Sequence, residues 1–371
     1  MQYDNGSASN AISAQIFKTL PAIIKSDMTR EEEINIVLCG GIHVVILGAG
    51  ASIASTLRNS EINGKVLPAM NNIVDVVGLE NIVKSLPKQL RNLKDDFEKL
   101  YSQLFSLPEF NEQKIEIETR VYNYFQSLKL PDCPTIYDYL ILSLRNNKDV
   151  IATFNWDPFL YQAYVRNQEL VKSPGILHLH GNVALGYCKS DQTIGPAGYK
   201  SKHTLKEWEP TRLLYPVEKK DYNTDHFING QWEALQDELK VAKRVTVFGY
   251  RAPESDIEAI TLMQQAWGGS EKRAMEQFEL IDVRPEEDVK SSWKNFIHSH
   301  HYNYHTNFFE SSIARHPRRS VESYHHWSSP FTPNDVFQDG NLVPSDFRTL
   351  EEMWEWYKPL IEAEKKYYDK K

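Results

Sequence analysis

Three polar side chains that could perform chemistry follow short apolar runs of the chain. Asn155 and Asp157 follow the apolar start of the stretch "IATFNWDPFL", and His180 is the second histidine of "LHLHGN" further along. An amide donates and accepts hydrogen bonds, and a carboxylate accepts them. An imidazole with an ordinary pKa of about 6.5 can take a proton from water near neutral pH. Together these groups could orient a reactant and activate a water molecule.

Each of these residues also has a purely structural interpretation. An asparagine at a strand end is often a cap or turn residue, and a histidine on an apolar strand is often a core residue that donates to a carbonyl. Asp157 precedes Pro158 and could equally cap a helix that begins there. Taken one at a time, the residues leave both interpretations open.

A glycine-rich turn follows the first strongly apolar run, "IHVVILGAGAS". Gly48 permits a tight turn, Gly50 allows close approach of the backbone to a phosphate, and Ala49 and Ser52 complete the loop. The usual dinucleotide fingerprint has a third glycine where this chain has Ile53, and no phosphate-loop Gly-Lys-Ser/Thr follows. The alternative is a small-residue turn that packs a helix on a strand.

Apolar runs and helical patterns alternate along the chain, and these elements must position the polar residues. The predicted strands are 42–48, Asp149–Asn155, Gly175–Gly181, Arg244–Tyr250 and Phe278–Val283, with helices near 229–243 and 255–267. Continuous hydrophobicity is typical of parallel strands buried on both faces. We therefore predict an α/β fold: a Rossmann-like parallel sheet with helices on both faces, a helical insertion and a C-terminal extension. Ligands bind beyond the carboxyl ends of such strands.

The remaining segments suggest the domain organisation. Residues 1–35 are predicted to be an N-terminal arm or peripheral helix, and residues 36–294 the Rossmann domain with the helical insertion at 73–145. Residues 295–371 form the predicted extension, with a regulatory or assembly role. Seven histidines lie between His298 and His326, without cysteine or carboxylate partners at recognisable ligand spacing. We interpret them as part of a capping or assembly surface rather than a metal site.

The bulk composition excludes several classes of protein. The 371 residues are 41% hydrophobic and 25% charged, and the net charge of -8 disfavours a general nucleic-acid binder. We expect no direct sequence-specific nucleic-acid binding. Three scattered cysteines fit neither a disulfide framework nor a zinc ribbon. No secretory signal or membrane span is predicted, so a cytoplasmic location is the expectation.

The ordered set "GAGAS", "TFNWD", "LHLHGN" and "VFGYRAPESD" resembles the sirtuin-like family, and most closely its bacterial branch of NAD-consuming proteins in phage-defence systems. The resemblance covers roughly residues 40–290. It implies that Asn155 is essential for cleaving NAD, that His180 is the catalytic histidine and that Asp157 helps to hold the nicotinamide amide. The other residues that it places against NAD, along its diphosphate and adenosine side, are Gly48, Ala49, Gly50, Ser52, Gly249, Tyr250 and Asp282.

The chain departs from the deacetylating sirtuins at three places. Phe154 stands where those enzymes usually have glutamine, and "STLRNSEING" replaces their Asp-Phe-Arg segment. Only Cys188 lies where they carry a zinc ribbon, so no zinc is expected. These departures disfavour protein deacylation and favour hydrolysis of NAD to nicotinamide and ADP-ribose.

The resemblance also implies a biological setting. Sirtuin-like proteins of about this length occur beside a hexameric HerA-type ATPase in defence operons. The resemblance therefore implies an effector that depletes NAD in anti-phage defence, as a homo-oligomer that docks on such a partner. An unrestrained NAD hydrolase would poison its own cell, so we place a restraint in segment 73–145 or after residue 295. The alternative is a module that senses NAD or ADP-ribose without turnover and regulates an assembly.

Overall fold

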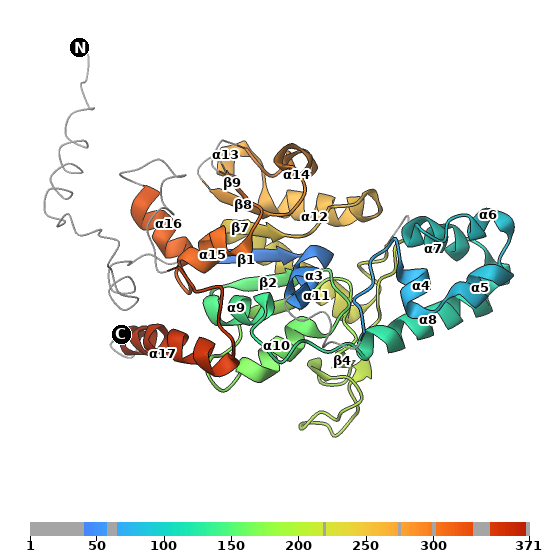
Figure 1. Cartoon of the computed structure of the whole chain (residues 1–371), viewed down its shortest axis with the longest axis horizontal. Coiled ribbons are helices and arrows are strands. Elements are labelled where there is room, and N and C mark those ends of the chain that lie inside the picture. Colours follow the sequence, from blue (N-terminus) through green and yellow to red (C-terminus); the bar gives the residue numbers. More distant parts are fainter. Residues whose placement is uncertain are drawn as a thin grey trace, which may run out of the picture.

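The computed structural model describes residues 41–57, 65–217, 220–273, 276–298, 302–328 and 342–368, so the predicted arm at 1–35 lies outside the described residues. At its centre is a six-stranded sheet in the order β3-β2-β1-β7-β8-β9, in which every neighbouring pair is parallel (Figure 1). The strands are β1 (Ile42–Leu47), β2 (Val150–Thr153), β3 (Gly175–His178), β7 (Ala242–Phe248), β8 (Gln277–Ile281) and β9 (Tyr302–His305). The predicted Rossmann-like α/β fold is confirmed. Its topological switch point lies between β1 and β7.

Strand β1 shows why the sheet is covered on both faces. Val44 and Ile46 pack into one hydrophobic cluster, whereas Val45 and Leu47 pack into the other. All four side chains are completely buried. Because successive side chains of a strand point to opposite faces, an unbroken apolar run fits a strand between two helical layers.

The helices form those two layers. On one face the core includes α11 (His226–Val241), α12 (Ile257–Trp267) and α14 (Glu286–Trp293). The helices of the other face are α3 (Ala49–Thr56), α9 (Ile136–Ser143), α10 (Phe159–Asn167), α15 (Ser312–Arg315) and α17 (Leu350–Tyr368). None of the described helices has both the length and the apolar character to cross a membrane.

The insertion after β1 forms a helical arm that projects from the sheet (Figure 1). Its elements are α4 (Ile73–Val77), α5 (Glu80–Ser85), α6 (Lys88–Arg91), α7 (Phe97–Phe105), η2 (Pro108–Phe110) and α8 (Asn111–Gln126). Helix α7 buries Phe97, Leu100, Tyr101 and Leu104, the spacing of one helical face, and Asp96 caps it by accepting from the Lys99 N–H. By contrast α9, at the end of the predicted insertion, contacts α3 and α10.

Two features have no counterpart in the predicted elements. Strand β9 comes from the histidine-rich segment and pairs with β8 at the edge of the sheet. A small antiparallel sheet also follows β3, built from β4 (Leu185–Cys188), β5 (Thr193–Pro196) and β6 (Glu209–Pro210) in the order β5-β4-β6. The remaining short elements are η3 (Glu254–Asp256), α13 (Ser270–Arg273), η4 (Phe308–Glu310) and α16 (Ser320–Ser328).

Buried ion pairs attach the C-terminal helices to the Rossmann core. Glu322 of α16 accepts hydrogen bonds from Arg145 at 2.8 Å and from Lys148 at 3.2 Å. Glu364 of α17 pairs with Arg318, and its carboxylate lies 3.5 Å from the Arg145 guanidinium. The extension therefore supplies a strand to the sheet and helices to its face. Within the described ranges, no group of three or more His, Cys, Asp or Glu side chains could hold a metal ion.

Candidate active site

Asn155 lies just beyond the carboxyl end of β2 and reaches across to the glycine turn after β1. Its Nδ2 donates to the Gly48 carbonyl at 2.8 Å, to Ser52 Oγ at 2.9 Å and to the Tyr137 hydroxyl at 3.1 Å. The side chain is partly exposed. Strands β1 and β2 are neighbours in the sheet, so the fold brings these residues together from distant parts of the sequence.

Asp157 and Ser52 continue this network into the core. Ser52 Oγ donates to the Asp157 carboxylate at 2.6 Å and lies 2.6 Å from the Tyr137 hydroxyl. The other Asp157 oxygen accepts the Phe159 N–H, one of the amides at the start of α10 that has no partner within the helix. Burial raises the pKa of Asp157 to about 6, although the bonds from Ser52 and Phe159 act in the opposite direction.

Tyr137 is a member of this network that the sequence patterns did not single out. It lies in the first turn of α9, which begins with a capping box formed by Thr135 and Asp138. The "T-x-x-D" spacing of Thr135 and Asp138 is the local signal that could have marked the start of this helix. The tyrosine hydroxyl reaches Ser52 because α9 packs against α3, a contact that the local sequence does not report.

The glycine turn packs tightly against the turn after β7. Gly50 N–H donates to the Gly249 carbonyl at 3.0 Å, and Gly48 N–H donates to Phe248 at 3.0 Å. A Cβ on Gly48 would lie 2.4 Å from Tyr250 Cα, and Gly249 has a φ of +62°. The structure thus gives these glycines a packing role across the switch point. A phosphate-binding role for Gly48, Ala49, Gly50 and Ser52 remains a prediction.

Phe154 packs between the two predicted site residues Tyr250 and His180. Its ring stacks on Tyr250 with centroids 4.0 Å apart and an interplanar angle of 7°. Its edge meets the His180 ring at 4.8 Å and 89°. An aromatic side chain at position 154 thus lines one side of His180.

His180 lies two residues beyond the end of β3 and is only 6% exposed. Its Nε2 is 3.4 Å from the Tyr222 hydroxyl and 4.0 Å from Asp256 Oδ1. Burial lowers the pKa of His180 to about 3, while Asp256 raises it and Lys220 lowers it. The imidazole is thus neutral at pH 7, the form that can accept a proton.

Residues 211–217, together with Lys220 and Tyr222, cover His180. Leu214 N–H donates to the His180 carbonyl at 3.0 Å. The next residue, Gly181, has a φ of +77°, and a Cβ there would lie 2.0 Å from the Arg212 carbonyl oxygen. A side chain at position 181 would collide with the Arg212 backbone and push it away, which explains on steric grounds why "LHLHGN" has a glycine there.

Asp282 lies at the end of β8, and its carboxylate is engaged by a neighbour. Arg284 donates to Oδ1 through its backbone N–H at 2.9 Å and Nε at 3.1 Å, and to Oδ2 through Nη2 at 2.7 Å. The predicted contact of Asp282 with the adenosine side of NAD is untested. Such a contact would require this arginine to share or release the carboxylate.

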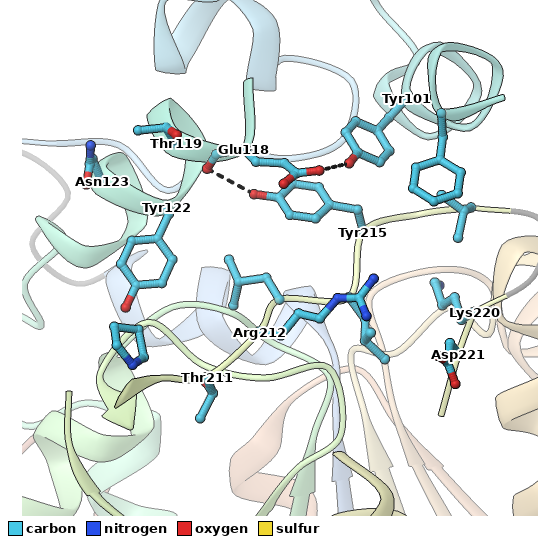
Figure 2. Close-up of a pocket in the computed structure, with 15 residues that line it drawn as sticks. Tyr101, Glu118, Thr119, Tyr122, Asn123, Thr211, Arg212, Tyr215, Lys220 and Asp221 are labelled. Atoms are coloured by element: carbon cyan, nitrogen blue, oxygen red, sulfur yellow. Dashed lines mark hydrogen bonds between the residues drawn. The ribbon is translucent and has the colours of Figure 1, made fainter. Parts of the chain in front are cut away.

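A cavity of about 490 Å³ opens between the helical arm and the segment that covers His180. Figure 2 shows Tyr101, Tyr122 and Tyr215 around it, with the Arg212 side chain extending beneath Tyr215. The Tyr101 and Tyr215 rings stack at 4.8 Å, and the Tyr215 hydroxyl donates to the Glu118 carbonyl at 3.1 Å. None of the predicted site residues lines this cavity. Lys220 connects the two places, because it lines the cavity and also contacts Asp256.

The structure therefore brings most of the predicted residues to one edge of the sheet in two adjoining groups. The first group contains Gly48, Ser52, Asn155 and Asp157, joined by hydrogen bonds. The second contains His180 and Tyr250, which meet through Phe154 and Asp256. Ala49 is exposed at the start of α3.

Comparison with known proteins found similarity among solved structures. No family model matches the chain, and no curated protein matches it. A structure described as "The Structural basis of Sirtuin Substrate Affinity" is 13% identical, with a TM-score of 0.34, over 80% of this chain and 99% of that chain. One described as "Structural Basis for the Mechanism and Regulation of Sir2 Enzymes" is 11% identical, with a TM-score of 0.33, over 91% and 98%.

A third structure is a mutant of a Sir2 homologue in complex with 2'-O-acetyl-ADP-ribose. It is 14% identical to this chain, with a TM-score of 0.35, over 69% of this chain and 93% of that one. Identities and scores this low assign neither a family nor an activity. The fold assignment rests on the strand order and parallel pairing of the chain itself.

Proposed function

We propose that the protein is an NAD glycohydrolase, which cleaves NAD to nicotinamide and ADP-ribose. One observation carries this proposal: the Asn155 amide is bonded to the glycine turn, while His180 follows the neighbouring strand at the same edge of the sheet. In parallel α/β sheets this edge, beside the switch point, is where nucleotides bind. The ordered motifs from which the sirtuin-like resemblance was inferred all meet there.

The reaction needs little covalent help from the protein. The bond between the nicotinamide nitrogen and the ribose anomeric carbon breaks, and its electron pair returns to the nitrogen, which loses its positive charge. Water forms the new bond to the anomeric carbon, and one proton is released. The site must hold the nicotinamide, tolerate positive charge on the ribose and position the water.

Each proposed role follows from the chemistry of its side chain. Asn155 Nδ2 and Oδ1 would orient the water or a ribose hydroxyl. Asp157 would accept a hydrogen bond from the carboxamide NH₂ of nicotinamide, in addition to that from the Phe159 N–H. His180 would take the proton from water, directly or through a ribose hydroxyl. Burial makes this imidazole a weak base in the closed site, and the Asp256 carboxylate, which raises its pKa, is the group that favours the proton transfer.

Turnover of NAD by the purified protein tests the proposal. We expect nicotinamide and ADP-ribose in equal amounts, and their loss in Asn155→Ala and in His180→Ala. The matched control for the histidine is His298→Ala, because His298 lies near Gly268 on another part of the molecule. Full turnover in both site variants would show that the site is wrongly assigned.

A second function, nucleotide sensing without turnover, is favoured by the way the site is closed. His180 is buried beneath residues 211–217, and the Gly50 N–H is already bonded to the Gly249 carbonyl. A sensor would bind NAD or ADP-ribose in isothermal titration and leave both intact. Binding followed by release of nicotinamide supports the hydrolase instead.

We further propose the biological setting that the sequence resemblance implies. The protein would act as a restrained effector that depletes NAD during phage infection, as a homo-oligomer beside a HerA-type ATPase. Sedimentation with and without such an ATPase tests the assembly, and a monomer in both cases contradicts it. Protein deacylation is a competing activity, and acetylated peptide with NAD would then yield acetylated ADP-ribose.

A further inference from the structure

A buried ion pair lies beside His180. Lys220 Nζ donates to Asp256 Oδ1 and to the Ser255 carbonyl at 3.3 Å, and Tyr250 donates to Asp256 Oδ2 at 2.7 Å. Lys220 is 8% exposed and Asp256 4%. A lysine and an aspartate are rarely buried to this extent unless they are paired.

The pair faces one particular nitrogen of the imidazole. His180 Nε2 lies 3.4 Å from the Tyr222 hydroxyl and 4.0 Å from Asp256 Oδ1. Within the part of the chain that the structure describes, Nδ1 of His180 makes no hydrogen bond. The two nitrogens therefore have different surroundings: Nε2 faces oxygen atoms and a carboxylate, and Nδ1 is left for other partners.

A neutral imidazole carries one proton, and its neighbours decide which nitrogen holds it. A carboxylate near Nε2 favours the Nε2–H tautomer, because it stabilises the positive end of that N–H bond. The Tyr222 oxygen can accept from the same N–H group. The lone pair that can take up a proton then lies on Nδ1.

We propose that Asp256 and Lys220 are positioning residues for His180, in which Asp256 holds the imidazole as the Nε2–H tautomer and Lys220 keeps Asp256 ionised and in place. This proposal deepens the proposed NAD hydrolysis and rests on it for the chemical step. In that step a proton moves from the attacking water to Nδ1, while the C–N bond electrons leave with nicotinamide. The resulting imidazolium carries N–H groups at both nitrogens, and the Asp256 carboxylate offsets its charge.

The other groups around the pair agree with an ionised Asp256. Burial alone would raise the pKa of Asp256, but the charge and hydrogen bond of Lys220 and the hydrogen bond from Tyr250 act in the opposite direction, and its pKa lies below the ordinary value. Glu98 of the helical arm approaches through Ser255, whose hydroxyl donates to it at 3.3 Å, and burial raises the pKa of Glu98. Among the described residues, the titratable groups that act on His180 are Tyr222, Asp256 and Lys220, while Tyr250 and Glu98 lie around Asp256.

The test uses the double variant Asp256→Leu/Lys220→Met, which replaces the ion pair by apolar side chains of similar volume. Such replacements of buried pairs often leave stability unchanged. The control is Lys243→Met/Glu276→Leu, which removes a partly exposed Lys–Glu pair with an N···O distance of 3.0 Å away from the site. A third variant, Lys220→Arg, keeps a cation beside Asp256.

Two readouts separate positioning from a merely structural role. The first is long-range ¹H–¹⁵N NMR of histidine-labelled protein, with His180 assigned by its absence in His180→Gln. We expect the Nε2–H tautomer in the wild type, the control and Lys220→Arg, and a shift toward the Nδ1–H form in the double variant. The second is NAD turnover, for which we expect kcat to fall about 10- to 100-fold in the double variant with little change in KM.

The outcomes also distinguish this proposal from the proposed function. An Nδ1–H tautomer in the wild type, or a double variant with unchanged tautomer and kcat, overturns the positioning role. A tautomer shift in a protein that never releases nicotinamide supports the positioning role and contradicts NAD hydrolysis. A kcat loss shared by the Lys243→Met/Glu276→Leu control would trace the effect to general destabilisation, and that result also overturns the proposal.

Discussion

Replacing Asn155 with alanine separates its contribution to stability from its proposed contribution to chemistry. The Asn155 amide has two N–H bonds, which it shares among the Gly48 carbonyl, Ser52 and Tyr137. No acceptor is left without a partner in Asn155→Ala. Gly48 O still accepts from Ala51 N–H at 3.0 Å, and Ser52 and Tyr137 still bond to each other.

The magnitude follows from these contacts. Two net hydrogen bonds at about 0.5–1.5 kcal/mol each give a loss of about 1–3 kcal/mol in the free energy of unfolding. Urea unfolding followed by tryptophan fluorescence measures this loss. Asn146→Ala is the matched control, because Asn146 Nδ2 makes one bond, to Ser173 O at 2.7 Å, away from the site. We expect it to lose about 1 kcal/mol and to keep full NAD turnover.

Either of two results for Asn155→Ala would refute this interpretation of the residue. A loss above about 5 kcal/mol in Asn155→Ala would mean that Asn155 is chiefly a structural residue, since exceptional losses mark disrupted cores or networks. Unchanged stability would mean that the amide does not bond to the glycine turn in solution.

Three further predictions concern the surroundings of the site. Gly249→Ala should destabilise the protein by more than about 2 kcal/mol, because φ is +62° and a Cβ would lie 2.5 Å from Gly50 Cα. In the control Gly230→Ala, the new Cβ in α11 meets nothing within 4 Å and should stabilise the protein by about 0.5–1 kcal/mol. Equal urea midpoints of the two variants would contradict this prediction. The pKa of Asp157 is raised from 3.8 to about 6, so the folded state binds its proton more tightly than the unfolded state does. This stabilisation is fully present below pH 4 and is lost as the pH rises through 6. Relative to Asp157→Asn, the free energy of unfolding of the wild type should fall by about 2–3 kcal/mol between pH 4 and pH 7, and a pH-independent difference would refute the raised pKa. Glu322→Gln should lower the free energy of unfolding by about 3 kcal/mol, because it removes the buried carboxylate that pairs with Arg145 and Lys148. Glu355→Gln, at an exposed pair, should lower it by less than about 0.5 kcal/mol. Similar losses in the two variants would show that these ion pairs do not anchor the extension.

The sequence predicted five of the six parallel strands, because each is a short apolar run bounded by turn residues. It missed β9 for a physical reason. Tyr302–His305 alternates aromatic and polar residues, and all four are only half-buried at the edge of the sheet. The antiparallel strands β4, β5 and β6 are similarly short and contain glycine or proline, so no apolar run marked them.

The candidate site was predictable where residues follow strands directly. Asn155, Asp157 and His180 could be placed at one edge because parallel strands end together. Tyr137 and the Lys220–Asp256 pair could not, because each reaches the site from an element whose packing depends on the whole fold. Lys220 and Asp256 are 36 residues apart, a separation that no local periodicity reports.

The most direct test is chromatographic measurement of NAD, nicotinamide and ADP-ribose after incubation of NAD with the purified protein, alone and with a HerA-type ATPase. We expect loss of NAD with equal gains of nicotinamide and ADP-ribose, and no products from Asn155→Ala or His180→Ala under the same conditions. Intact NAD in both incubations of the wild-type protein would contradict this expectation.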